Sequence, residues 1–114
     1  MKIKGLGVDI VENNRFSSFP KGALEKIFTP FELSEMERRV DKTEFLASRF
    51  AVKEAVVKAL GTGFGAIGAR DIETRNDEKG KPFVSVKGER KDNIHISLSH
   101  EKEYSIAFAV LEEL

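Results

Sequence analysis

The stretch RFAVKEAVVKAL, residues 49–60, predicts a helix that is apolar around most of its circumference. It nevertheless carries Glu54 and Lys58, which stand four residues apart and share one side of the helix with small alanines. A charge that is covered by protein must be paired or put to use, because burying it alone is costly. We therefore expect the sheet, another helix or another subunit to cover this helix, and the two charges to be candidates for a functional site.

The signals on either side of this stretch extend the helix and place another before it. Asp41 and Glu44 have the spacing of an N-cap and its return contact, and Gly61 has the position of a left-handed stop, so the helix is predicted over residues 43–60. Upstream, TPFE at residues 29–32 is a capping box that predicts a helix running to about residue 39.

The remaining chain has the period of two that is typical of strands. Residues 3–11 predict a first strand, residues 71–75 and 82–86 a hairpin around NDEKGK, and residues 94–99 and 104–110 a second hairpin. The whole reads as one α+β domain over residues 1–114, in which helices pack on one face of a mostly antiparallel sheet.

Composition limits the kinds of function. Lys and Arg together number 19, and Asp and Glu together also number 19, so the chain has no net charge that would attract it to nucleic acid or an anionic membrane. The absence of Cys excludes disulfides, thiolate zinc sites and a Cys nucleophile, and a reducing cytosol fits it. Asp9 interrupts the first apolar run too early for a signal peptide or a membrane span, so we expect a soluble, uncleaved protein.

Asp9 lies in the middle of the first strand, where a carboxylate is disfavoured unless a cation or donor meets it. Together with Glu54 and Lys58 it would suit Mg²⁺, a hard ion that is usually held by one or two carboxylates and completed by phosphates and water. Two plainer interpretations stay open: Glu54 and Lys58 form a surface ion pair, and Asp9 caps the turn after its strand.

Two further motifs are ambiguous. GFGAIG, residues 63–68, has the glycine spacing of a dinucleotide-binding motif. Because it follows a helix and precedes a strand, it is not a Rossmann fingerprint. A loop that a ligand approaches closely and an ordinary turn both fit these residues. SLSH, residues 97–100, lacks a nucleophile elbow, and its side chains suit phosphate or hydroxyl hydrogen bonding better than covalent catalysis.

Several stretches together resemble holo-acyl-carrier-protein synthases: GVDIVE at 7–12, FLASRFAVKEAVVKALGTGFG at 45–65, DIE at 71–73, GKP at 80–82 and ISLSH at 96–100. The resemblance implies a 4′-phosphopantetheinyl transferase, which moves the phosphopantetheine arm of coenzyme A onto a serine of an apo acyl carrier protein and releases adenosine 3′,5′-bisphosphate. It further implies a cytoplasmic enzyme of fatty acid biosynthesis, assembled as a homotrimer with active sites between subunits. The trimer would account for the apolar helix.

The family's motifs carry over residue by residue. Asp9 and Glu54 are implied to ligate Mg²⁺, Glu54 and Lys58 to be catalytic, and Arg15 to contact the acidic carrier protein. The serine proton would pass to Glu54 or to a water. Nine residues are expected to lie along coenzyme A: Arg49, Lys53, Lys58, Gly61, Thr62, Gly63, Gly65, Ser99 and His100. Of these, Arg49 and Lys53 would reach its 3′-phosphate from the edge of the helix.

One segment departs from the family. Only KGERKDNI, residues 87–94, connects the first predicted hairpin to the second. Many family members carry a longer connection with a short helix here, so contacts made by that connection cannot be carried over.

Two other kinds of protein also remain possible from the sequence: a Mg²⁺-dependent hydrolase of coenzyme A or a related pyrophosphate, and a non-catalytic trimeric binding module.

Overall fold

The computed structural model describes residues 2–114, and its longest element is the helix α3 (Lys42–Leu60). Asp41 caps this helix by accepting a hydrogen bond from the Glu44 backbone N–H at 3.0 Å. Gly61 ends it in the left-handed conformation, with φ at 76°. The cap at Asp41, the stop at Gly61 and the helix itself are confirmed, whereas the expected return contact of Glu44 is not formed, because its carboxylate lies 3.0 Å from His100.

The helix α2 (Pro30–Glu37) begins at the predicted capping box. The Thr29 hydroxyl accepts from the Glu32 N–H, and the Glu32 carboxylate accepts from the Thr29 N–H. The helix ends at Glu37, slightly before the predicted end. Its first turn therefore holds Glu32 in a fixed and buried position.

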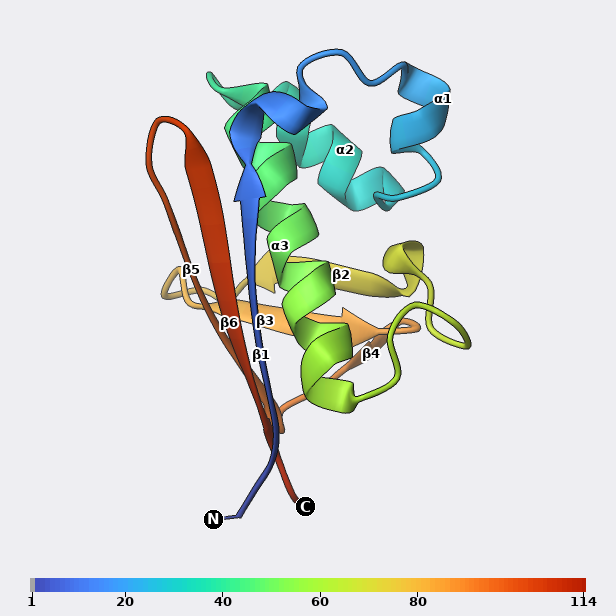
Figure 1. Ribbon diagram of the computed structural model, residues 1–114, viewed down its shortest axis with the longest axis vertical. Coiled ribbons are helices and arrows are strands. Elements are labelled where there is room, and N and C mark those ends of the chain that lie inside the picture. The colour runs from blue at the N-terminus through green and yellow to red at the C-terminus, as the bar shows by residue number, and fades with distance from the viewer. Residues whose placement is uncertain (1) are drawn as a thin grey trace.

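The strands form two antiparallel sheets rather than one. In the first, β6 (Tyr104–Glu112) lies between β1 (Ile3–Glu12) and β5 (Ile94–His100). In the second, β3 (Pro82–Val86) lies between β2 (Ile72–Asn76) and the short β4 (Glu89–Arg90). Figure 1 shows β2 and β3 running across the direction of α3, while β1 and β6 run beside it. The α+β class and both hairpins are confirmed, and the single sheet is corrected to two.

The short connection of residues 87–94 is built as a tight turn and an edge strand. Lys87 and Gly88 both have positive φ, 52° and 81°, as a two-residue hairpin turn requires. This turn joins β3 to β4.

The helix α3 lies directly on the backbone of β1. A Cβ at Gly7 would sit 1.9 Å from the Ala55 carbonyl oxygen, and one at Gly5 would sit 1.9 Å from that of Ala59. No side chain fits at either position, so the two glycines let strand and helix meet at backbone distance.

Both sheets and α2 contact α3, so this one chain covers the apolar helix that the sequence marks. The trimer is therefore not needed to explain that helix. Most of the exposed large apolar side chains lie instead on the outer face of the first sheet, away from α3: Leu6, Val8, Ile10, Tyr104, Ile106 and Phe108.

Short helical turns complete the fold: η1 (Asn13–Phe16) after β1, α1 (Lys21–Leu24) before α2, and η2 (Ala69–Asp71) before β2. Residues 61–68, here called the glycine-rich loop, join α3 to η2. Within residues 2–114, no helix combines the length and the apolar character that a membrane crossing needs.

Candidate functional site

Asp9 and Lys58 meet where β1 crosses α3. Asp9 belongs to the side of β1 that faces the helix, and its Oδ1 lies 3.2 Å from the Lys58 Nζ. The same ammonium donates to the Val8 carbonyl at 2.9 Å. Asp9 thus pairs with a cation from the helix instead of capping the following turn, and Lys58 turns to the strand instead of pairing with Glu54.

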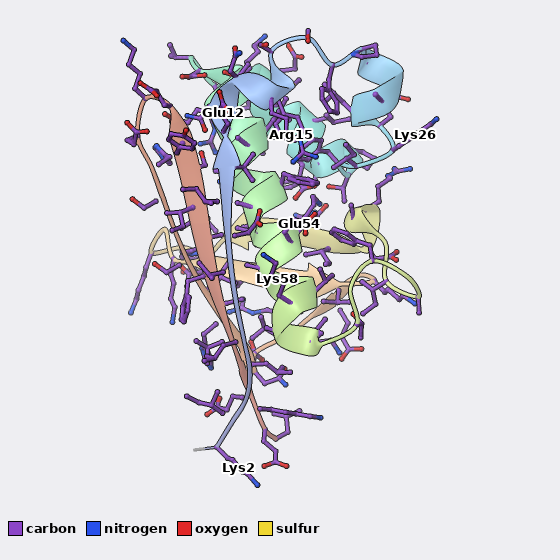
Figure 2. All side chains as sticks on the ribbon, in the orientation of Figure 1. Lys2, Glu12, Arg15, Lys26, Glu54 and Lys58 are labelled. Carbon is purple, nitrogen blue, oxygen red and sulfur yellow. The ribbon has the colours of Figure 1, made fainter. Side chains whose placement is uncertain are left out.

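Glu54 stands one helical turn before Lys58, on the same side of α3. Burial raises the pKa of its carboxyl, and the negative charge of Asp9 raises it further, while Lys58 and Arg15 act in the opposite direction. Figure 2 shows Arg15, Glu54 and Lys58 following one another along the side of α3 next to β1. We call Asp9, Glu54 and Lys58 the carboxylate cluster.

Arg15 lies at the upper end of this side, in the turn η1 that follows β1. Its guanidinium stacks over the Phe50 ring at 4.9 Å, and the side chain remains exposed. The stacking holds a cation at the surface beside the cluster, where it is accessible to a partner.

The cluster offers a metal ion two carboxylates. Within residues 2–114, no group of three or more His, Cys, Asp or Glu side chains gathers as a ready cation site. The raised pKa of Glu54 shows that Lys58 and Arg15 do not fully compensate for its burial and for the charge of Asp9. Two carboxylates beside an exposed lysine are a donor set that would fit Mg²⁺, with water and phosphate as further ligands.

Two other predicted residues meet at a separate groove. Arg49 and His100 line a cavity of about 290 Å³ together with Arg39, and the His100 Nδ1 lies 3.0 Å from Glu44 Oε1. The Arg49 guanidinium is stacked over the Phe45 ring at 4.4 Å. Burial and the neighbouring Arg39 lower the pKa of Arg49, as expected where cations gather. The carboxylates of Asp41 and Glu44 also line the groove, so Arg39 and Arg49 are the groups there that would meet an anion such as a phosphate.

The groove and the carboxylate cluster lie on opposite sides of α3. Nine residues separate Arg49 from Lys58, which corresponds to about 180° around a helix of 3.6 residues per turn. A single chain therefore presents two partial sites facing different directions, and does not bring Arg49 and His100 to Asp9 and Glu54.

Lys53 has a different environment from the one expected for a phosphate ligand. Its side chain is 0% exposed, and its Nζ donates to Glu32 Oε1, Ala69 O and Ile72 O. An ammonium has three N–H donors, and all three are used. The structure thus removes Lys53 from the groups that can reach the 3′-phosphate.

The glycine-rich loop follows the carboxylate cluster along the chain. Gly61 and Gly63 both have positive φ, and open space surrounds the Cβ positions of these two residues and of Gly65. Thr62 donates its hydroxyl to the Gly63 carbonyl at 3.0 Å. The loop therefore offers an open, glycine-lined surface to a ligand.

Ser99 lies on the outer face of the first sheet, opposite Ile106 of β6.

A larger cavity of about 750 Å³ lies beyond the end of α3, beside Leu60, Ile67 and the C-terminal residues. None of the predicted site residues lines it, so it plays no part in the candidate site.

Glu32 and Glu44 are the residues whose contacts sequence reasoning missed. Both were recognised only as cap residues, yet Glu32 holds Lys53 and Glu44 contacts His100. Each partner is distant along the chain, so no local spacing signals either contact.

The chain is similar to known proteins over nearly its whole length. The family model described as the 4′-phosphopantetheinyl transferase superfamily matches residues 5–109. A holo-[acyl-carrier-protein] synthase of Halothermothrix orenii is 46% identical, over 97% of this chain and 98% of the relative, and one of Bacillus cereus is 45% identical over 96% of each.

Solved structures are similar as well. The holo-(acyl-carrier-protein) synthase of Bacillus anthracis in complex with CoA (3′,5′-ADP) superposes with a TM-score of 0.86 at 40% identity, over 98% of both chains. That of Helicobacter pylori in complex with coenzyme A gives a TM-score of 0.80 at 30% identity, over 94% of this chain and 99% of the other.

Proposed function

Because the chain belongs to the 4′-phosphopantetheinyl transferase superfamily, we propose that it transfers the 4′-phosphopantetheine group of coenzyme A to a serine of apo acyl carrier protein, releasing adenosine 3′,5′-bisphosphate. The observation that carries the proposal is the carboxylate cluster, in which two acids and a lysine from β1 and α3 meet at an accessible surface. In this proposal the enzyme acts in the cytoplasm and supports fatty acid biosynthesis.

We assign Asp9 and Glu54 as the ligands of Mg²⁺. The position of the two carboxylates supports this assignment, since Asp9 from β1 and Glu54 from α3 both neighbour Lys58. When bound, the ion would neutralise developing negative charge on the pyrophosphate of coenzyme A.

The proposed reaction is an in-line displacement. The serine oxygen bonds to the β-phosphorus, the bond from that phosphorus to the leaving phosphate breaks, and its electron pair leaves with adenosine 3′,5′-bisphosphate. Lys58 is exposed enough to meet the phosphate oxygens while it remains tied to Asp9. The proton of the serine hydroxyl would pass to Glu54 or to a water.

We propose that a homotrimer completes the site. The outer face of the first sheet exposes apolar side chains of β1 and β6, such as Val8 and Phe108, which are 49% and 43% exposed. Contiguous apolar surface of this kind is typical of a protein interface. Neighbouring copies on this face would bring the groove of one subunit, with Arg49 and His100, to the cluster of the next.

Coenzyme A would then extend between subunits. In this arrangement the pyrophosphate lies at the cluster, the glycine-rich loop and Ser99 lie along the ligand, and the 3′-phosphate lies at Arg49 and His100. Arg15, beside the cluster, is the proposed contact with the acidic carrier protein.

The test is intact-mass spectrometry of an apo acyl carrier protein incubated with the protein, coenzyme A and Mg²⁺. We expect the carrier to gain the mass of one phosphopantetheine, and a chelator to prevent the gain. Cleavage of coenzyme A with an unchanged carrier would instead identify a hydrolase. If neither molecule changes with any of several bacterial carriers, the transferase proposal is wrong.

A further inference from the structure

The buried pair of Lys53 and Glu32 lies outside the machinery proposed above, yet it is among the most enclosed polar groups in the fold. The Lys53 Nζ lies 2.7 Å from Glu32 Oε1, and the side chains are 0% and 1% exposed. A hydrophobic pair of similar volume would often be as stable, so the charges call for a further explanation.

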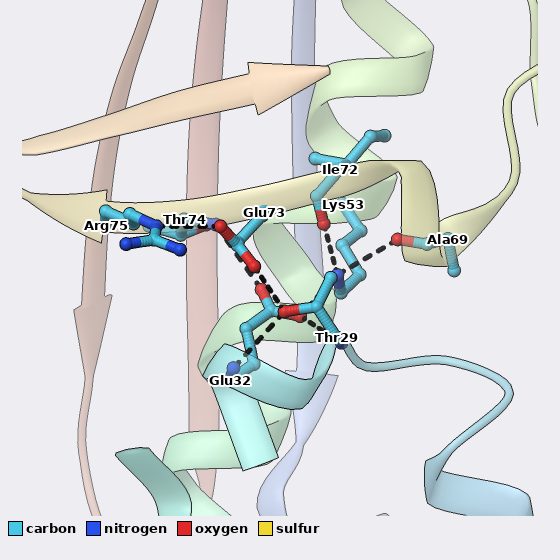
Figure 3. A network of polar contacts seen from close by, with 8 residues as sticks. All are labelled: Thr29, Glu32, Lys53, Ala69, Ile72, Glu73, Thr74 and Arg75. Carbon is cyan, nitrogen blue, oxygen red and sulfur yellow. Dashed lines mark hydrogen bonds and ion pairs between the residues drawn. The ribbon is translucent and has the colours of Figure 1, made fainter. Parts of the chain in front are cut away.

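The partners of Lys53 suggest one. Besides Glu32, its ammonium donates to the carbonyls of Ala69, at 2.9 Å, and Ile72 (Figure 3). Ala69 is the first residue of η2, the short turn that follows the glycine-rich loop, and Ile72 directly follows that turn. A single side chain from the middle of α3 thus satisfies two backbone oxygens at the far end of the loop.

The carboxylate that holds Lys53 is itself fixed from two sides. Glu32 Oε1 also accepts from the Thr29 N–H at 3.0 Å, and Oε2 accepts from the Thr74 N–H at 3.3 Å. The N-terminus of α2 and the strand β2 therefore hold Glu32 in place, and through it the Lys53 ammonium.

The first part of the glycine-rich loop has little packing support, since residues 61–66 are exposed and only the later Ile67 packs against the core. It begins at Gly61, directly after α3, and open space surrounds the Cβ positions of Gly61, Gly63 and Gly65. Its start is fixed by the helix. Its far end is held by Asp71, whose carboxylate accepts from the Gly68 N–H at 2.8 Å, and by Lys53, which stands eight residues, or about 12 Å, before Gly61 along α3. Without the tie through Lys53, η2 would be held less firmly and more of the loop would have to be ordered when a ligand binds, which weakens affinity.

We propose that Lys53, held by Glu32, is a positioning residue that anchors the glycine-rich loop and thereby sets the affinity for coenzyme A. This role rests on the proposed function for its kinetic consequence. Lys53 does not contact the carboxylate cluster, because its ammonium points to Glu32 and β2, so the turnover step should be almost unaffected.

The experiment compares two variants that differ in the loop contacts. Glu32→Gln removes the charge of the pair but leaves Lys53, which even as an uncharged amine keeps two N–H groups for Ala69 and Ile72. Glu32→Gln combined with Lys53→Met removes the donors and leaves no buried charge unpaired. Arg75→Ala is the matched control, since Arg75 belongs to the same network through Glu73, at 2.7 Å, without touching the loop.

We expect Glu32→Gln and Arg75→Ala to keep the wild-type KM for coenzyme A, and the double variant to raise it about tenfold with kcat little changed. Hydrogen exchange of the free proteins should show faster exchange of residues 61–71 in the double variant alone. A KM within about twofold of that of Glu32→Gln, or unchanged exchange in this segment, would overturn the anchoring role.

Two safeguards keep the result interpretable. If the double variant does not fold, Lys53→Gln is measured in its place, because the shorter amide should also lose the carbonyl contacts and free the loop. If the wild-type protein modifies no carrier, the transferase proposal fails, and hydrogen exchange alone decides whether Lys53 anchors the loop.

Discussion

Lys53 and Glu54 are neighbours in α3, but the fold uses their charges in opposite ways. Lys53 is enclosed, and Glu32 and two carbonyls satisfy all its donors. Glu54 is half-buried with a raised pKa, and the lysine one turn away pairs with Asp9 instead. The two regions contain the same kinds of residue, Glu and Lys. What distinguishes structural charges from charges open to a ligand is therefore the number of partners and the access of solvent.

The largest expected effect tests the accessible region. Glu54→Gln and Asp9→Asn should each abolish transfer, a loss beyond the ~100-fold that outer partners of a metal site can cause. The fold should persist. Folding raises the pKa of the Glu54 carboxyl, so ionising it is less favourable in the folded protein than in the unfolded chain. The protein therefore loses stability as the pH rises above the unfolded-state pKa of this group, and Glu54→Gln should slightly increase stability at neutral pH.

The measurement is the rate of carrier modification by intact mass, with thermal unfolding of the same samples as the control. Undiminished transfer in both variants would refute the metal assignment.

The next effect contrasts the two lysines. Lys53→Met should lower the free energy of unfolding by about 3–5 kcal/mol, because it leaves Glu32 buried and unpaired. Lys58→Met should lower it by about 1 kcal/mol or less, because Lys58 is half-exposed, and should instead slow transfer. Urea denaturation of both variants checks the contrast, and equal losses of stability would remove the distinction between the two regions.

A smaller effect is expected at the edge of the carboxylate cluster. Arg15→Ala should weaken carrier binding about tenfold by removing one charged contact, with the KM for coenzyme A unchanged. Titration of the carrier dependence at low and high salt checks this, since the wild-type advantage should shrink as salt screens the charge. A change confined to coenzyme A would mean that Arg15 is not the docking contact.

The smallest effect is a pKa shift within the cluster. In metal-free protein, Asp9→Asn should lower the pKa of Glu54, because it removes a neighbouring negative charge, and Lys58→Met should raise it, because it removes a positive one. Carboxyl carbon shifts followed by NMR against pH report both directions. An unchanged pKa in both variants would show that the three groups do not form one electrostatic unit.

Local signals predicted the elements well, and long-range contacts account for what they missed. The capping box at Thr29 and the left-handed Gly61 set helix ends through neighbouring residues, so the sequence identifies them. The fate of Lys53 depends on Glu32, 21 residues away, and on the backbone of β2. Its position on the helix surface, one residue from Glu54, predicts none of this.

The division into two sheets was missed for a similar reason. Both hairpins are visible as alternating patterns, but which strands pair beyond a hairpin depends on how they pack against α3. The pairing of β1 with β6 joins the two ends of the chain, and no local pattern specifies it. The candidate site inherits this limit, because Asp9 comes from β1 and its partner from α3.

The contact of Gly5 and Gly7 with the α3 backbone also supports the carboxylate cluster. A Cβ at Gly7 would meet the Ala55 carbonyl oxygen at 1.9 Å, so any side chain there would push the helix away from the strand. Asp9 stands two residues after Gly7 on β1, and Glu54 directly precedes Ala55 on α3. The nearness of the two acids thus depends on a residue that has no side chain of its own.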